Sequence, residues 1–206
     1  MIIDFHTHAF PEKIAKPTIE KLSYTAGGLI PQTDGTFNGL KAVMERDGVD
    51  KSVVLAIATN ERQQKAVNNF KLGYNCAQSV FLAFADRYGF DENTALKLAS
   101  SFGAGMGRLR EVCGAVTAMF AIAGLENGYS SPTDDDAKAK HYELIQQLAQ
   151  NFKSKFNTII CSELLGLEKG ADSPIPQKRT PQYYENRPCE EFIKYAAELI
   201  ERKILK

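Results

Sequence analysis

Hydrophobic and polar positions follow two different rhythms along this chain. In the first sixty residues, short apolar runs at 2–5 and 51–57 predict two strands, and the second run is continuous and β-branched. Such a run is typical of a parallel sheet covered on both faces. Between the two runs the pattern predicts helices over about 11–24 and 36–47, separated by a loop rich in glycine and proline. The sequence therefore predicts a β-α-α-β unit over residues 1–60.

From about residue 61 the hydrophobic period changes to about 3.6 residues and remains helical to the end of the chain. The predicted helices span about 61–72, 76–88, 91–102, 113–126, 132–157, 161–166 and 189–204. Ser131 and Pro132 are expected to be the N-cap and first residue of the fifth of these helices. The loop at 167–188 holds four of the eight prolines. We therefore expect a mainly α fold, with an all-helical domain over 61–206.

The helix predicted over 113–126 differs from the others because it lacks a polar face. Between Cys113 and Leu125 the only polar side chain is Thr117, and no charged residue occurs before Glu126. A surface helix exposes polar side chains on every turn, so this helix is expected to be buried on all sides with the other helices around it.

Composition and charge exclude several classes of partner. The chain has 25 acidic and 25 basic residues, and this balance argues against binding to nucleic acid or to an anionic membrane surface. No apolar run reaches the roughly 18 residues that span a bilayer, and no signal peptide is visible. We therefore expect a cytoplasmic protein. In a reducing compartment, four cysteines are more typical of buried, catalytic or metal-bound thiols than of a disulfide framework.

All four cysteines stand at or near predicted helix starts: Cys76, Cys113, Cys161 and Cys189. A helix N-terminus carries partial positive charge and unpaired N–H groups, which stabilise a thiolate and lower its pKa. If the four ends converge, the thiolates could hold a metal or an iron–sulfur cluster, or pair as redox-active dithiols. The alternative is that they are plain core side chains, because their spacings of 37, 48 and 28 residues contain no Cys-x-x-Cys knuckle.

Three glycines at alternate positions precede Cys113: Gly103, Gly105 and Gly107. They lack the Gly-x-Gly-x-x-Gly spacing and follow a helix, so a dinucleotide site is not expected. They form either a tight turn between helices or a cradle whose N–H groups donate to cysteine sulfur. The neighbouring Arg108 and Arg110 either lower the pKa of Cys113 or are solvated loop charges.

Two histidines follow the first strand: His6 and His8. Alternate side chains of a strand point the same way, so this pair suits two nitrogen ligands on one Zn²⁺. The segment 2–11 around this pair, together with 50–60 and 63–70, resembles the opening of the metal-dependent amidohydrolases. That resemblance implies a (β/α)₈ barrel that binds metal through His-x-His and through residues of later strands. It covers only about two strands of eight, and the remaining histidine, His141, lies on a different kind of segment, so a third zinc ligand is missing.

Five segments of the helical part carry a second resemblance: Phe70–Val80, Ala99–Arg108, Glu111–Thr117, Cys161–Gly166 and Pro188–Cys189. They resemble the redox-active protein family named for its cysteine pattern, C_GCAxxG_C_C, from about residue 61 onward. The resemblance implies that the four cysteines are the family's own, and a related domain in the split-Soret cytochromes is associated with an iron–sulfur cluster. Ala118 departs from the pattern, where glycine is usual. The absence of a Cys-x-x-Cys-His motif argues against covalent haem.

The leading hypothesis is a redox or electron-transfer protein, an oxidoreductase if an enzyme, whose four cysteines form one site. An iron–sulfur cluster is preferred to a dithiol pair. We expect a redox partner protein or a small-molecule thiol, and a homodimer. The chain is interpreted as a truncated barrel fragment fused to a complete cysteine domain. Two alternatives stay open: a remnant of a metal-dependent hydrolase using His6 and His8, and a non-catalytic helical oligomerisation domain.

Overall fold

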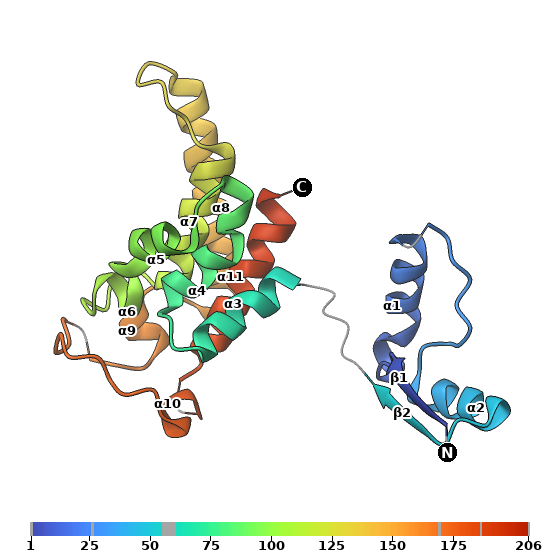
Figure 1. Ribbon diagram of the computed structural model, residues 1–206. Coiled ribbons are helices and arrows are strands. Elements are labelled where there is room, and N and C mark those ends of the chain that lie inside the picture. Colours follow the sequence, from blue (N-terminus) through green and yellow to red (C-terminus); the bar gives the residue numbers. More distant parts are fainter. Residues whose placement is uncertain (1, 26, 55–60, 169, 186, 206) are drawn as a thin grey trace. The chain divides into compact units, whose positions relative to one another are not determined.

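A computed structural model describes the chain except for residues 1, 26, 55–60, 169, 186 and 206, and except for the side chains of residues 5, 6, 21 and 25. The chain divides into two compact units, residues 1–59 and residues 60–206 (Figure 1). No helix in the described part is long and apolar enough to cross a membrane.

The first unit has the expected β-α-α-β order. Strand β1 (Ile3–Thr7) and strand β2 (Lys51–Val54) pair in parallel, and helices α1 (Glu12–Thr25) and α2 (Phe37–Asp47) connect them. Thr36 caps α2 by accepting a hydrogen bond from the N–H of Gly39.

The expectation of a barrel-type fragment is not supported. Within the described residues these two strands are the whole sheet, and two strands cannot close a barrel. The expectation that the second strand is covered on both faces is also wrong, because Val53 is 41% and Val54 is 39% exposed. The end of that predicted strand, residues 55–57, lies outside the described residues. Helix α2 has no buried residue, so this unit has little core of its own.

The second unit is helical throughout its described length. Its elements are α3 (Glu61–Lys71), α4 (Cys76–Phe84), the 3₁₀ turn η1 (Ala85–Tyr88), α5 (Glu92–Ser100), α6 (Gly103–Met106), α7 (Gly114–Asn127), α8 (Asp135–Phe156), α9 (Cys161–Leu164), α10 (Pro181–Glu185), α11 (Cys189–Leu199) and the π-helical turn η2 (Ile200–Ile204). The longer helices match the predicted ones. The start of α8 does not, because Asp134 and not Ser131 is its N-cap, accepting from the N–H of Ala137. The short helix α10 lies in the segment predicted as loop.

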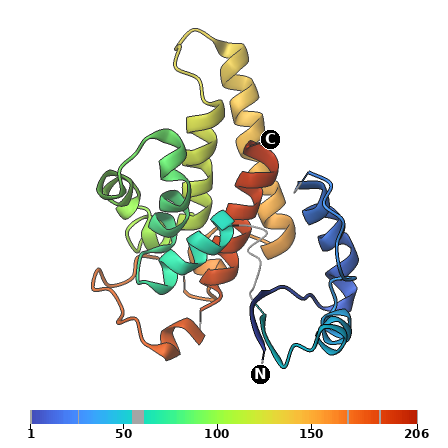
Figure 2. The same cartoon turned by 45° about the vertical axis from the view of Figure 1, so that its right-hand side comes forward.

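Helix α7 is the centre of the second unit. It packs against α4, α8 and α11, and α8 runs beside it in both views (Figures 1 and 2). Val116, Met119 and Ile122 are completely buried, as the missing polar face predicts. Burial on all sides does not extend along the whole helix, because Leu125 near its C-terminal end is exposed. The N-terminal end of α7, which follows Cys113, is therefore the end held inside the helical core.

Candidate functional site: four cysteines at helix starts

Each cysteine stands at the start of a helix, as the sequence predicts. Cys76, Cys161 and Cys189 are the first residues of α4, α9 and α11, and Cys113 is the N-cap of α7. All four thiols are free. The start of α4 is fixed by a capping box, because the side chain of Asn75 accepts from the N–H groups of Ala77 and Gln78.

Two short backbone segments hold Cys113 and Cys161 near each other. Val112 and Ile160 form an isolated antiparallel bridge. Beside it, the N–H of Cys113 donates to the carbonyl of Ile159 at 2.8 Å, and the N–H of Cys161 donates to the carbonyl of Glu111 at 2.7 Å. The starts of α7 and α9 are therefore tied together although 48 residues separate their cysteines in the sequence.

Cys76 also lies near the start of α7, because residue 114 is a glycine and has no side chain. A Cβ atom built on Gly114 would lie 2.6 Å from Cys76 Sγ and 2.6 Å from the carbonyl oxygen of Phe102. Only glycine leaves space for this sulfur, so Cys76 packs against the first residue of α7, directly after Cys113. Gly114 could not be singled out from the sequence, because nothing in the spacing shows which glycine faces a thiol.

The electrostatics also connect the four thiols. Burial is the main cause that raises the pKa of Cys113, Cys161 and Cys189, the last to about 12. The negative charge of a Cys76 thiolate raises the pKa of each of these three further. Because the interaction between charges weakens with distance, Cys76 lies within electrostatic range of all three.

The expectation that helix starts lower the thiol pKa therefore fails for these three cysteines. At Cys113 the N–H groups of Ala115 and Val116 in the first turn of α7 do lower the pKa, but burial outweighs them. Desolvation of a thiolate disfavours the charged form, and a helix start compensates only part of that cost. At neutral pH these three thiols are therefore protonated in the folded chain.

The glycine-rich turn before Cys113 has an unusual backbone. Five successive residues, 104–108, have positive φ angles between 53° and 71°, so most of α6 and the two residues after it form a left-handed turn. Ala104, Met106 and Arg108 adopt this conformation despite their side chains, which is energetically unfavourable. Gly105 is required for a second reason, since its Cβ would lie 2.6 Å from Cys161 Cβ.

The two arginines of this turn contact Asp172 and Cys161 rather than Cys113. Arg110 is only 2% exposed and donates from Nη1 to Cys161 Sγ at 3.7 Å. Its Nη2 donates to Asp172 at 2.6 Å, and Arg108 Nη2 donates to the same carboxylate at 2.8 Å. Arg110 thereby lowers the pKa of Cys161, partly offsetting burial. The expectation that these arginines act on Cys113 or are solvated is therefore wrong for Arg110. Sequence gave no sign of a partner 62 residues away.

Within the described part of the chain, no group of three or more histidine, cysteine or acidic side chains is arranged to hold a single metal ion. The side chain of His6 lies outside the described residues. The zinc site predicted at His6 and His8 therefore lies partly outside the described residues and stays a prediction.

The comparison with protein families gives one match. The family described as "Putative redox-active protein (C_GCAxxG_C_C)" matches residues 74–203, and the chain belongs to this family. The match includes all four cysteines and begins later than the resemblance beginning near residue 61. It gives no support for an amidohydrolase segment fused before it. Comparisons with curated proteins and with solved structures find no significant match.

Proposed function

We propose that this member of the redox-active family carries electrons on an iron–sulfur cluster bound by Cys76, Cys113, Cys161 and Cys189. The observation that carries the proposal is geometric, because backbone hydrogen bonds tie the starts of α7 and α9 together and Cys76 Sγ packs against Gly114 at the start of α7. The charge of Cys76 also raises the pKa of Cys189, which adds the fourth helix start. Four cysteine thiolates are the usual ligands of such clusters, which supply one-electron redox chemistry.

The arrangement supports a cluster better than a single ion. A single metal ion needs its ligands to converge on one point, which these side chains do not do. An iron–sulfur cluster would instead be held by the four cysteines together, around a larger volume than one ion occupies, and would supply one-electron redox chemistry. Mutual repulsion and burial make four thiolates unfavourable in the metal-free site, and cationic iron would offset that repulsion.

The surroundings of the thiols also suit a cluster. Hydrogen bonds to sulfur and burial are two of the factors that set the reduction potential of a cluster. Arg110 supplies such a bond to Cys161, and the helix starts direct partial positive charge toward the thiols. The electron partner would be a redox protein or a small-molecule thiol.

A dithiol mechanism is the second candidate, and the packing of Cys76 against Gly114 favours the pair Cys76 and Cys113. Thiol–disulfide exchange requires an accessible thiolate. Cys113 is buried and its pKa is well above the ordinary value, which makes it a poor attacking group.

Anaerobic purification with analysis of iron, acid-labile sulfide and visible absorbance tests the proposal. We expect a brown protein that loses its iron in Cys189→Ser, a half-buried position where serine should be tolerated. Ser100→Ala, which removes an exposed hydroxyl, is the control and should keep the colour. A colourless protein that stays iron-free after anaerobic reconstitution contradicts the cluster. A mass two hydrogens lower, assigned to Cys76 and Cys113, would favour the dithiol.

A further inference from the structure

A cavity of about 260 Å³ in the second unit is lined in part by Asn75, which precedes Cys76, and by Arg110, which donates to Cys161 Sγ. Its lining also comes from Gly103, from Ala104 and Gly107 of the left-handed turn, and from described residues between 174 and 183 together with Arg187. The cavity contains no cysteine in its lining, so it is a separate space beside the thiol site.

The lining is strongly basic. It includes four guanidinium groups and, among the described residues, no carboxylate: Arg108, Arg110, Arg179 and Arg187. One acidic side chain nearby, Asp172, accepts hydrogen bonds from Arg108 and Arg110. A single carboxylate cannot neutralise four guanidinium groups, so the cavity keeps an excess of positive charge.

Arg179 and Arg187 are held by rings and neutral oxygens. The guanidinium of Arg179 lies 4.8 Å from the ring centre of Phe70 and 4.6 Å from that of Tyr183, and its Nη2 donates to the carbonyl of Tyr74. Arg187 lies 4.8 Å from the same Tyr183 ring and donates from Nη2 to Gln177 Oε1 at 2.6 Å. Stacking fixes the two cations in place, and among the described residues neither forms an ion pair.

Two donors of this set have no hydrogen-bond partner within the described structure. They are Arg110 Nε and Arg179 Nη1, and both atoms are buried. A buried donor without a partner is costly, and Arg110 as a whole is almost completely buried. The oxygens of a bound anion are the groups that would satisfy such donors, because guanidinium groups match carboxylate and phosphate oxygens.

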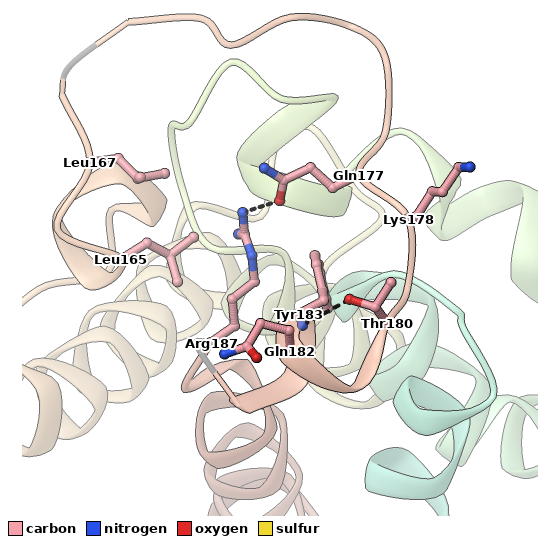
Figure 3. Close-up of a pocket in the computed structure, with 8 residues that line it drawn as sticks. All are labelled: Leu165, Leu167, Gln177, Lys178, Thr180, Gln182, Tyr183 and Arg187. Carbon is pink, nitrogen blue, oxygen red and sulfur yellow. Dashed lines mark hydrogen bonds between the residues drawn. The ribbon is translucent and has the colours of Figure 1, made fainter.

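A second cavity, of about 360 Å³, shares three lining residues with the first: Gln177, Tyr183 and Arg187. Figure 3 shows the hydrogen bond from Arg187 to Gln177 in the middle of this space. Leu165 and Leu167 lie on the opposite side from Lys178. The second cavity therefore offers an apolar wall next to the arginines. Together the two spaces fit a molecule with an anionic group and a small organic body.

We propose that the arginine-lined cavity binds a small organic oxyanion, a carboxylate or a phosphate ester, next to the cysteines. Arg110 joins the two sites, because it lines the cavity and donates to Cys161 Sγ. The bound molecule lies one side chain away from the thiols. The binding of this oxyanion does not depend on the proposed function of the cysteines.

Isothermal titration calorimetry on the full chain at low ionic strength tests the site, with inorganic phosphate and succinate as separate probes and chloride as the reference salt. We expect saturable one-to-one binding of at least one probe. Binding of phosphate alone assigns the phosphate class, and binding of succinate alone assigns the carboxylate class. Binding of neither probe above the chloride reference overturns the proposal.

The variant Arg187→Gln should weaken binding by about tenfold or more, because it removes one charged donor. Arg202→Gln removes a cation that does not line the cavity and should leave binding unchanged. If Arg187→Gln is misfolded by circular dichroism, Arg108→Gln replaces it with the same expectation. Equal binding by the folded arginine variant and the control also overturns the proposal. The titration is run on metal-free and metal-loaded protein. Failure of the cluster proposal appears as missing iron, whereas failure of the anion site appears as missing binding heat in both forms.

Discussion

Cys76 packs against Gly114 so closely that a Cβ at Gly114 would lie 2.6 Å from the sulfur. This contact places Cys76 at the start of α7, directly after Cys113, the N-cap of that helix. The site therefore depends on a backbone surface as much as on the thiols themselves.

Replacing Gly114 by alanine should damage the site while a matched change on the same helix should not. In Gly114→Ala the new methyl meets Cys76 Sγ and a backbone carbonyl, so we expect lost iron and a lower free energy of unfolding. Gly124 lies in the same helix with nothing within 4 Å of an added Cβ. Gly124→Ala should stabilise by about 0.5–1 kcal/mol, from helix propensity. Iron analysis and urea unfolding of both variants provide the measurement, and equal behaviour would remove the assigned role of Gly114.

Arg110 should matter more than a surface arginine because it is buried and binds both Cys161 and Asp172. We expect Arg110→Gln to lower the free energy of unfolding by about 2 kcal/mol, since hydrogen bonds to charged groups contribute that much. Arg202→Gln, which breaks an exposed pair with Glu198, should cost less than about 1 kcal/mol. The Arg110 change should also slow alkylation of Cys161 at fixed pH, because its thiol loses the cation that lowers its pKa. Unchanged alkylation would show that the contact has no electrostatic effect.

The helix pattern and the positions of the cysteines were predictable because both follow from local rules. Hydrophobic periodicity located α4, α7, α8 and α11, and the start of each helix containing a cysteine was correct. The missing polar face predicted the burial of α7, but local rules do not show how strongly burial acts on a thiol. Burial reversed the expected direction of the pKa shift at Cys113.

The partners of Arg110 could not be predicted from the sequence, because they also depend on how the chain packs. The contacts of this residue with Cys161 and Asp172 join segments 51 and 62 residues apart, and no periodicity encodes such pairs. In the first unit, the sequence predicted the element order but not the exposure of Val53 and Val54, because a hydrophobic run does not say what covers it.

The left-handed turn makes a prediction about strain. Ala104 has φ of 53°, a conformation that disfavours any side chain. Ala104→Gly should stabilise the protein by about 1 kcal/mol, because glycine adopts this region freely. Ala139, exposed in α8, provides the opposite case, and Ala139→Gly should destabilise by about 1 kcal/mol. Thermal and urea unfolding of the two variants give the comparison, and destabilisation by both would mean that Ala104 is not strained.

The division into two units predicts that the helical one folds alone. Its core, from Ala66 to Ile204, lies entirely within residues 60–206. A chain that begins at residue 60 should therefore unfold cooperatively and keep iron and absorbance equal to the full chain. Residues 1–59 expressed alone should show no cooperative transition, because the described part of that unit has Ala15 as its only buried hydrophobic residue. Loss of iron on removal of the first unit would instead give that unit a part in the site.

The raised thiol pKa values predict how stability depends on alkaline pH. Burial, and then the charge of Cys76, raise the pKa of Cys189 from an ordinary value of 9.0 to about 12. Between these values the folded chain keeps the proton on this thiol and the unfolded chain releases it. Rising pH therefore favours unfolding, and the metal-free, reduced protein should lose stability from about pH 9 upward.

The variant Cys189→Ser removes this titration but leaves those of Cys113 and Cys161. Its stability should therefore fall less steeply with pH than that of the parent protein, without becoming independent of pH. Urea unfolding of both proteins at about pH 8 and about pH 10.5 measures the two slopes. Parallel slopes would mean that the Cys189 thiol ionises as easily in the folded chain as in the unfolded one, so that folding does not raise its pKa.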